Sequence, residues 1–178
     1  MKKSLILIII VLITLGYWFS GTREATLNPD SSPSVLFQPN PENAIFLFDD
    51  RPITLTNGRS EQRDMATGMT DEVWLLDKKV AGDLNNDQKN DTVILLARSG
   101  GGSGVFIYIA TYISGPVSYK GTNAIFIGDR ISPESVSIAN GVITFKYLDR
   151  KSNEPFAAEP TVPVSKQFTY QNGEFVEK

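Results

Sequence analysis

The 178-residue chain contains neither cysteine nor histidine. Without cysteine it can form no disulfide, thiolate metal site or cysteine nucleophile, and it offers no cysteine for lipid attachment. Without histidine it lacks the commonest general base, the commonest transition-metal ligand and any Ser-His-Asp triad. A hydrolase built from this sequence would therefore have to use carboxylates or a metal-activated water.

The charge of the chain argues against a nucleic-acid partner. Its formal net charge is −3, and Lys2 and Lys3 precede a hydrophobic segment, so the rest of the chain carries −3 − 2 = −5. Binding to phosphates requires clustered lysine and arginine instead. We therefore expect no nucleic acid among the partners.

Residues 5–19 form an apolar run that is interrupted only by one threonine and one glycine. A helix over residues 4–20 would be about 25 Å long, at the short end of a membrane span. Aromatic residues at positions 17–19 would lie at the headgroups, and Lys2 and Lys3 favour a cytoplasmic N-terminus. The sequence thus predicts a membrane anchor over residues 1–21, with the following domain in the periplasm or outside the cell.

A cleaved signal peptide is the alternative interpretation of the same segment. Cleavage requires small residues just before the cut, and the bulky residues at 17–19 make most candidate positions poor. A mature N-terminus near residue 25 would indicate cleavage. Both interpretations place the domain outside the cytoplasm.

Residues 22–43 are predicted to be a linker, because they contain four prolines and several serines and their apolar residues show no period. Proline-rich stretches favour extended, semi-rigid conformations. We therefore expect a stalk that separates the membrane from a domain over residues 44–178.

Short β-prone runs separated by turn signals fill this domain. The expected strands are 44–48, 52–56, 72–80, 92–98, 105–114, 123–127, 135–139, 142–148 and 164–171. Residues 92–96 and 105–113 are almost continuously apolar, which is typical of central strands covered on both faces. The predicted fold is mostly β, an antiparallel sandwich-like or barrel-like single domain preceded by one N-terminal transmembrane helix.

Three Asn-Gly pairs, at 57–58, 140–141 and 172–173, predict tight turns, because both central residues of a type I′ turn need a positive φ. No segment of the domain shows a sustained helical apolar stripe. Residues 60–69 are the only place where a short helix is expected to be possible.

The segment Gly82–Asp91 is rich in oxygen-bearing side chains at alternate positions. Calcium binds six to eight oxygens, and a tight loop can turn alternate residues toward one ion. The candidate ligands are Asp83, Asn85, Asp87 and Asp91 through their side chains and Lys89 through its carbonyl. We expect such an ion to be structural and weakly bound, with a Kd on the order of 10⁻⁴–10⁻³ M.

This acidic loop resembles the calcium loops of integrin-like FG-GAP repeats and of dockerin-like modules. It departs from them at Asn86 and Gln88, which occupy positions where those loops often have glycine. Asparagine tolerates a left-handed backbone far better than glutamine does. The alternative interpretation is an acidic turn held by Asx hydrogen bonds without an ion.

Two further segments allow both a functional and a structural interpretation. The glycine-rich segment 99–104 is followed by an expected strand rather than by a helix, so it is interpreted as a wide hairpin loop and not as a phosphate-binding loop. Arg130 and Arg150 either form loop salt bridges with nearby acids or gather into an anion-binding patch.

Several motifs in order resemble a family of small, uncharacterised bacterial proteins that are secreted or membrane-anchored and β-rich. That family has a Gly-Asp-Leu-Asn-Gly-Asp-Gly…Asp loop, a Gly-Gly-Ser-Gly-Thr-Phe strand start and a Leu-Gly-Asp-Arg-Ile turn. The matching residues are Gly82–Asp91, Gly101–Phe106 and Ile127–Ile131, with Asp149, Arg150, Glu154 and Pro155 further on. The resemblance covers roughly residues 44–175 and implies localisation and an intact domain, but no activity.

Two functions remain as hypotheses. One is a non-enzymatic binding or envelope-interaction module on a membrane stalk, whose partner would be an envelope protein or a glycan. The other is an extracytoplasmic hydrolase that uses carboxylates or a metal-activated water. A deep pocket with unpaired, desolvated carboxylates would favour the enzyme. An exposed sheet face or edge with aromatic residues would favour binding.

Overall fold

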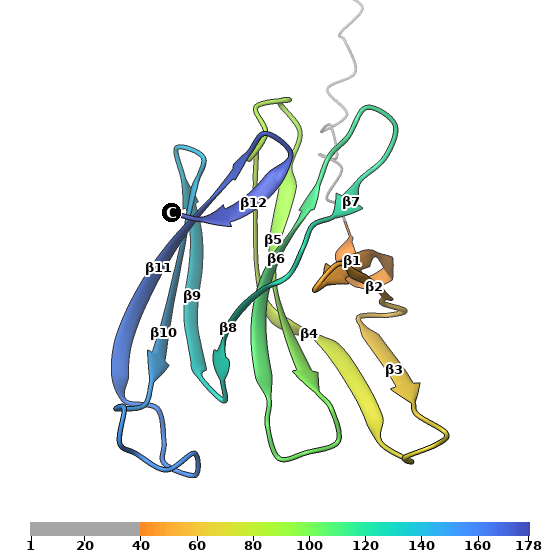
Figure 1. Cartoon of the computed structure of the whole chain (residues 1–178). Coiled ribbons are helices and arrows are strands. Elements are labelled where there is room, and N and C mark those ends of the chain that lie inside the picture. Colours follow the sequence, from red (N-terminus) through yellow and green to blue (C-terminus); the bar gives the residue numbers. More distant parts are fainter. Residues whose placement is uncertain (1–39) are drawn as a thin grey trace, which may run out of the picture. The chain divides into compact units, whose positions relative to one another are not determined.

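The computed structural model describes residues 40–178, and these form antiparallel β-sheets (Figure 1). The prediction of a mostly β fold is therefore confirmed, while the predicted membrane helix lies outside the described residues. Residues 40–178 contain no helix with the length and hydropathy to span a membrane. The elements are η1 (Pro41–Asn43), β1 (Ile45–Phe48), β2 (Arg51–Thr54), β3 (Arg59–Arg63), β4 (Thr70–Gly82), β5 (Asp91–Ser99), β6 (Phe106–Ile113), β7 (Lys120–Gly121), β8 (Ile125–Asp129), β9 (Ser132–Ala139), β10 (Val142–Asp149), β11 (Val162–Gln171) and β12 (Glu174–Glu177).

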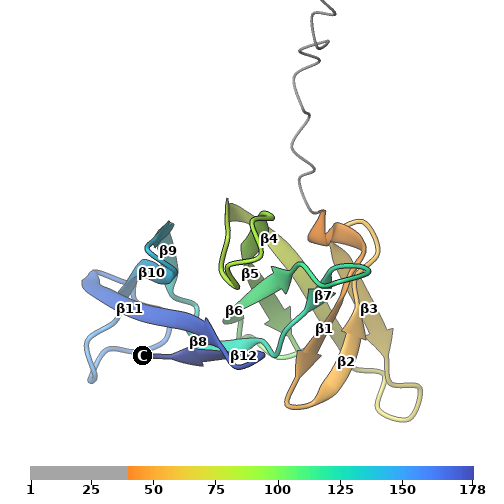
Figure 2. The same cartoon turned by 90° about the horizontal axis from the view of Figure 1, so that it is seen from above.

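The strands form three sheets that lie side by side in Figure 2. The central sheet has the order β3-β4-β5-β6-β7, and β8 also pairs with β6. A four-stranded sheet, β12-β11-β10-β9, lies on one side of it, and the β1–β2 hairpin lies on the other. The central sheet is therefore covered on both faces over part of its area.

Two hydrophobic clusters fill the spaces between these layers, and β5 contributes to both. Its residues Val93 and Leu95 face the four-stranded sheet, whereas Ile94 and Leu96 face the β1–β2 hairpin. All four side chains are completely buried. The prediction of a central strand covered on both faces is confirmed for β5, whose alternate residues point to opposite faces. β6 is also central, but its outer face is only partly covered, because Phe106 is exposed.

Each of the nine expected strands is present, with ends that differ by a few residues. The sequence pattern did not predict β3, β7 or β12. The predicted type I′ turns are confirmed, since both residues of each Asn-Gly pair have a positive φ. The angles are 52° and 77° at Asn57-Gly58, 51° and 70° at Asn140-Gly141, and 53° and 87° at Asn172-Gly173.

The expectation of a possible helix within residues 60–69 is wrong. This segment contains most of β3 and the turn that leads into β4. Asp64 fixes the turn, because its Oδ1 accepts hydrogen bonds from the backbone N–H of Ala66 at 2.8 Å and of Thr67 at 3.4 Å. Gly68, with φ of 72°, reverses the chain. Strand pairing with β4 thus overrides the weak local helical preference.

Candidate functional site

The acidic loop joins β4 to β5, and its last residue, Asp91, is completely buried. One Asp91 oxygen accepts a hydrogen bond from the backbone N–H of Leu84 at 2.7 Å. The other accepts one from the backbone N–H of Ser114, also at 2.7 Å. Asp91 therefore ties the acidic loop to the end of β6.

The other acidic side chains of the loop accept hydrogen bonds from its own backbone. Asp83 accepts from the N–H of Asp87 at 3.2 Å and from that of Gln88 at 2.9 Å. Asn85 Oδ1 also accepts from the N–H of Asp87, at 3.1 Å. The contact between Asn85 and Asp87 is an Asx turn, and the two Asp83 contacts close the rest of the loop.

The Asp87 side chain also binds Ser114, the residue that follows β6. Its Oδ2 accepts a hydrogen bond from Ser114 Oγ at 2.6 Å, and its Oδ1 accepts one from the N–H of Lys89 at 2.9 Å. The hydrogen bond from Ser114 is the main reason why the pKa of Asp87 lies below its ordinary value. The Lys89 ammonium lies 3.9 Å from Asp87 Oδ2 and donates to the carbonyl of Gly115.

The backbone of the loop adopts the conformation that glycine would favour at the two positions where glycine is missing. Asn86 has φ of 60° and Gln88 has φ of 66°. A left-handed glutamine is strained by roughly 1–2 kcal/mol, because its Cβ approaches the following carbonyl oxygen. The backbone is thus left-handed at both positions.

The donor set of this loop suits calcium in its chemistry. Side-chain oxygens of Asp83, Asn85, Asp87 and Asp91 and the carbonyl of Lys89 are hard oxygen ligands of the kind that calcium prefers. In the described residues, no three acidic side chains are gathered in a metal-binding arrangement. If the ion binds, it would be held by these five residues and would neutralise their charge.

The glycine-rich segment 99–104 begins at the last residue of β5 and forms most of the wide hairpin loop to β6, which agrees with its structural interpretation. Gly104 lies beneath the ring of Phe106, and a Cβ added there would come within 2.8 Å of the Phe106 Cζ. The absence of a side chain at Gly104 therefore allows the Phe106 ring to fold back over this loop.

Arg130 and Arg150 are both engaged by the protein itself. The Arg130 guanidinium forms two hydrogen bonds with Asp129, at 3.1 and 2.7 Å, and lies 4.8 Å from the ring centroid of Phe156. Arg150 donates to the carbonyls of Ala158, Asp129 and Arg130. The Arg130–Asp129 ion pair agrees with the loop salt-bridge interpretation, whereas Arg150 binds backbone carbonyls instead of an acid.

An exposed aromatic surface, not identified in the sequence analysis, lies on the central sheet beside the β1–β2 hairpin. It consists of Phe106 and Tyr108 on β6 and Phe126 on β8, and we call it the outer aromatic face. The ring centroids of Phe106 and Phe126 are 6.1 Å apart, and those of Tyr108 and Phe126 are 5.6 Å apart. Phe106 is 37% exposed and Phe126 is 51% exposed.

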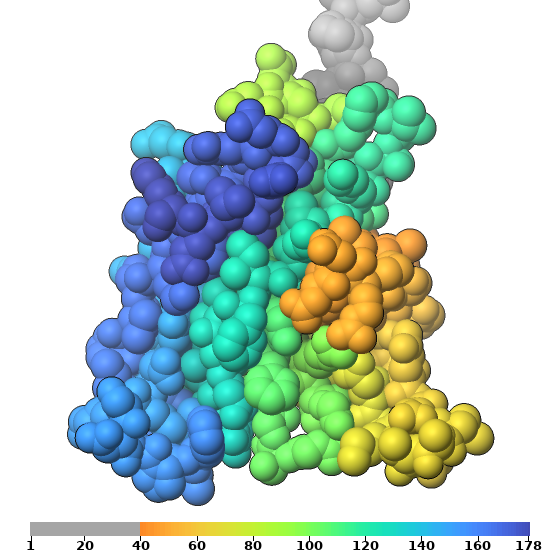
Figure 3. Space-filling model, in the orientation of Figure 1, coloured from red at the N-terminus to blue at the C-terminus, as the bar shows by residue number. Residues whose placement is uncertain are grey.

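Charged groups border the outer aromatic face. Tyr108 contacts Phe48 of the hairpin edge to face at 4.9 Å, so the hairpin covers one end of the surface. Next to Phe106, its pairing partner on β6, Arg98 of β5 binds both oxygens of Asp71 on β4, at 2.9 and 2.6 Å. In Figure 3 the green and teal surface of β6 and β8 lies open next to the orange hairpin.

The sequence did contain a signal for this surface. Phe106, Tyr108 and Tyr112 stand at alternate positions of one strand, and alternate positions share a face. This alternation of aromatic residues was not recognised, because the residues between them are also apolar and the whole strand forms one continuous apolar run. Phe126 joins the surface only through the pairing of β8 with β6.

The described carboxyl groups with a clear pKa shift are all shifted toward the charged form. They are Asp64, Asp87, Asp129 and Glu154, and hydrogen bonds with protein donors are the main cause in each case.

Comparisons of the chain with family models, with curated proteins and with solved structures gave no match.

Proposed function

We propose that this chain is a non-catalytic binding module of the cell envelope and that the outer aromatic face is its contact surface. The observation that carries the proposal is the exposure of two phenylalanine rings, Phe106 and Phe126, on an otherwise well-packed sheet. Contiguous exposed apolar side chains with a charged border are typical of protein interaction sites.

The energetics of this surface support the same proposal. Burial of a phenylalanine side chain contributes roughly 1.5–3 kcal/mol, so a partner that covers both rings gains a useful share of its binding free energy. Aromatic anchors at the centre of an interface commonly dominate its affinity. The bidentate Asp71–Arg98 pair already fixes these side chains at the border of the surface, so they lose little conformational freedom on binding.

The proposal includes a location and a structural ion. The predicted N-terminal anchor and its stalk would carry the module outside the cytoplasm, where an envelope protein or a glycan could reach it. The acidic loop would hold calcium as a brace between β4 and β5, with Asp83, Asn85, Asp87, Lys89 and Asp91 as ligands. The left-handed backbone at Asn86 and Gln88 supports this part of the proposal.

Site-specific photocrosslinking in the native envelope tests the contact surface. The full chain would carry a photoreactive phenylalanine analogue at position 126, and a matched chain would carry it at Val117, which is 97% exposed in the β6–β7 loop. We expect a discrete adduct from position 126 only, which disappears when Phe106→Ser is added. Equal labelling from both positions would refute the outer aromatic face as the contact surface.

Calorimetric titration of the metal-free full chain with calcium tests the ion. We expect heat of binding and a rise in melting temperature in the millimolar range, both reduced by Asp83→Ala. Absence of heat and of any thermal shift up to several millimolar calcium would remove the ion from the proposal.

A further inference from the structure

The edge of β4 is open over its second half. β3 pairs only with the first half of β4, from Thr70 to Trp74, and the last backbone contact on this side is the N–H of Leu75, which donates to the carbonyl of Gly58 at 2.8 Å. Within the described residues, positions 76–82 make backbone hydrogen bonds only with β5. Their outward N–H and C=O groups are therefore free to pair with another strand.

The turn at Asn57-Gly58 explains why β3 cannot cover this edge. Both residues have a positive φ, so the chain arrives from β2, reverses at this turn and begins β3 only at Arg59, opposite Trp74. β9 packs near the far end of β4, where a Cβ added at Gly82 would meet Ile138 Cδ1 at 3.1 Å, but the two strands do not pair. The open edge therefore lies between Leu75 and Gly82.

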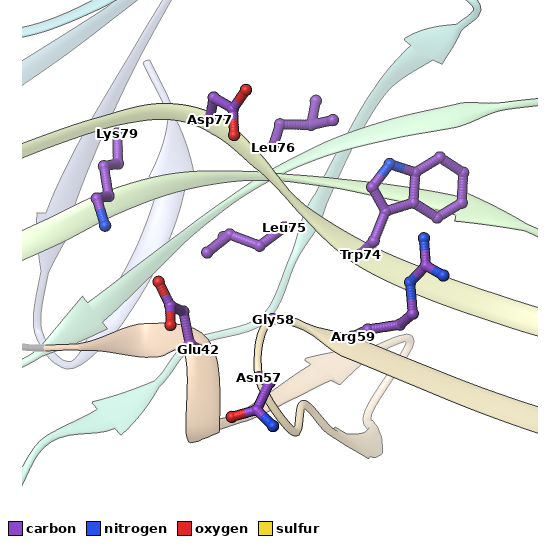
Figure 4. Close-up of a pocket in the computed structure, with 9 residues that line it drawn as sticks. All are labelled: Glu42, Asn57, Gly58, Arg59, Trp74, Leu75, Leu76, Asp77 and Lys79. Carbon is purple, nitrogen blue, oxygen red and sulfur yellow. The ribbon is translucent and has the colours of Figure 1, made fainter.

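A hollow of about 420 Å³ lies against the start of this edge (Figure 4). It forms at a bulge in β4. Leu75 pairs with Leu96 and Lys79 pairs with Ile94, so an advance of four residues on β4 matches an advance of two on β5, which leaves 4 − 2 = 2 extra residues on β4. The hollow extends from Trp74 past Leu75 to Lys79 in Figure 4. A bulge of this kind turns side chains away from the regular pattern of the strand.

Four polar side chains around the hollow form no hydrogen bond or ion pair with the described protein. They are Glu42, Asn57, Asp77 and Lys79, while the nearby Arg59 is engaged by Glu72 at 3.1 Å. Acidic and basic groups alternate around the edge, with Asp77 and Lys79 two residues apart on β4 itself. The side chains therefore complement a strand that carries opposite charges at alternate positions.

We propose that the hollow and the open edge of β4 bind an extended peptide segment of a partner protein, which adds to the central sheet as a new strand. Backbone hydrogen bonds to positions 76–82 supply affinity, and side chains at alternate positions supply selectivity. The preferred segment carries a basic residue opposite Asp77 and Glu42 and an acidic residue opposite Lys79. This site is separate from the outer aromatic face, so failure of one proposal leaves the other standing.

Fluorescence anisotropy with the full chain and a synthetic probe tests this site. The probe is a labelled peptide, Thr-Val-Lys-Val-Glu-Val-Thr, made also in two forms with N-methyl groups on its odd or on its even residues. Alternate N–H groups of a strand point to one side. We therefore expect one methylated form to bind at least about tenfold more weakly and the other to bind nearly as the parent does. Equal binding of both forms, or no binding of the parent, overturns the proposal.

A charge exchange identifies the site on the protein. We expect Asp77→Lys to weaken binding of the probe about fivefold. Binding should recover in part with a peptide in which only the lysine is replaced by glutamate, because its other glutamate still pairs with Lys79. Glu159→Lys, which changes another exposed acid, in the β10–β11 loop, is the matched control and should change binding less than about twofold. Loss of binding in both variants, or self-association of the chain that the probe does not reverse, contradicts a peptide site at β4.

Discussion

Asp91 is expected to be one of the most important polar side chains for stability in the described domain. It is completely buried, and its two oxygens accept hydrogen bonds of 2.7 Å from the backbone N–H groups of Leu84 and Ser114. A hydrogen bond to a charged group contributes about 1.5–3 kcal/mol, so the pair is worth roughly 3–6 kcal/mol. That is a large part of a typical unfolding free energy of about 5–15 kcal/mol.

The substitution Asp91→Asn isolates this effect, because the two side chains have nearly the same shape. The amide oxygen can satisfy one N–H, but the amide NH₂ then faces the other N–H and leaves it without an acceptor. We expect a loss of about 2–4 kcal/mol of unfolding free energy, and about 3–6 kcal/mol for Asp91→Ala. Asp77→Asn, which removes an exposed charge without a partner, is the control and should change stability by less than about 0.5 kcal/mol.

The assay is urea unfolding of the full chain in detergent, followed by tryptophan fluorescence, with and without a chelator. The midpoint should fall in Asp91→Asn while the slope with urea stays constant. If calcium binds with a Kd near 10⁻³ M, about 10 mM of it adds roughly 1.4 kcal/mol to the wild type. A loss below about 1 kcal/mol for Asp91→Asn in chelator would refute the assignment of Asp91 as a structural tie between the acidic loop and β6.

Three further predictions concern turn strain, close packing and pH. Gln88→Gly should raise the unfolding free energy by about 0.5–1 kcal/mol, because glycine relieves the left-handed φ of 66° at this position, and a decrease in a thermal unfolding series would contradict this. Gly121→Ala should prevent stable folding or cost more than about 4 kcal/mol, because its Cβ would overlap the Ile45 carbonyl oxygen and approach Phe46 Cδ1 to 2.5 Å; near-wild-type circular dichroism and melting temperature would refute it. The pKa values of Asp87, Asp129 and Glu154 are lowered in the folded state by hydrogen bonds, chiefly from Ser114, Arg130 and the backbone N–H of Lys151, respectively. The contribution of these three carboxylates to the unfolding free energy is therefore complete above about pH 5. It is lost as the pH falls through their folded-state pKa values, below about pH 4. Because the chain has no histidine, urea midpoints should stay nearly flat between about pH 5 and 8.

The sequence alone predicted most of the strands and their turns, because the signals for them are local. Residues 93–97 are apolar without a break, and this pattern requires both faces of the strand to be covered. The Asn-Gly pairs at 140–141 and 172–173 need no tertiary contact to favour a positive φ at both residues. Alternating residues on both sides of the first pair then define the hairpin β9–β10.

The same local reasoning failed for β3 and could not assign the acidic loop. The sequence Arg59–Arg63 is charged and has little β preference of its own, so only pairing with β4 makes it a strand. In the loop, the sequence showed oxygen-bearing side chains at alternate positions. It did not reveal that Asp91 is buried and that Ser114, which is distant in sequence, donates to Asp87 and Asp91.

What the sequence determined is thus the β character of the domain, the positions of its tight turns and the strand that is buried on both faces. The tertiary structure alone decided where surface is left uncovered. Phe126 reaches Phe106 only because β8 pairs with β6, and the edge of β4 is open only because the chain reverses at Gly58. The hydrophobic periodicity and the β propensity of a segment are properties of that segment alone, whereas the exposure of a side chain or strand edge depends on which segments pack against it. Both proposed binding surfaces depend on such exposure.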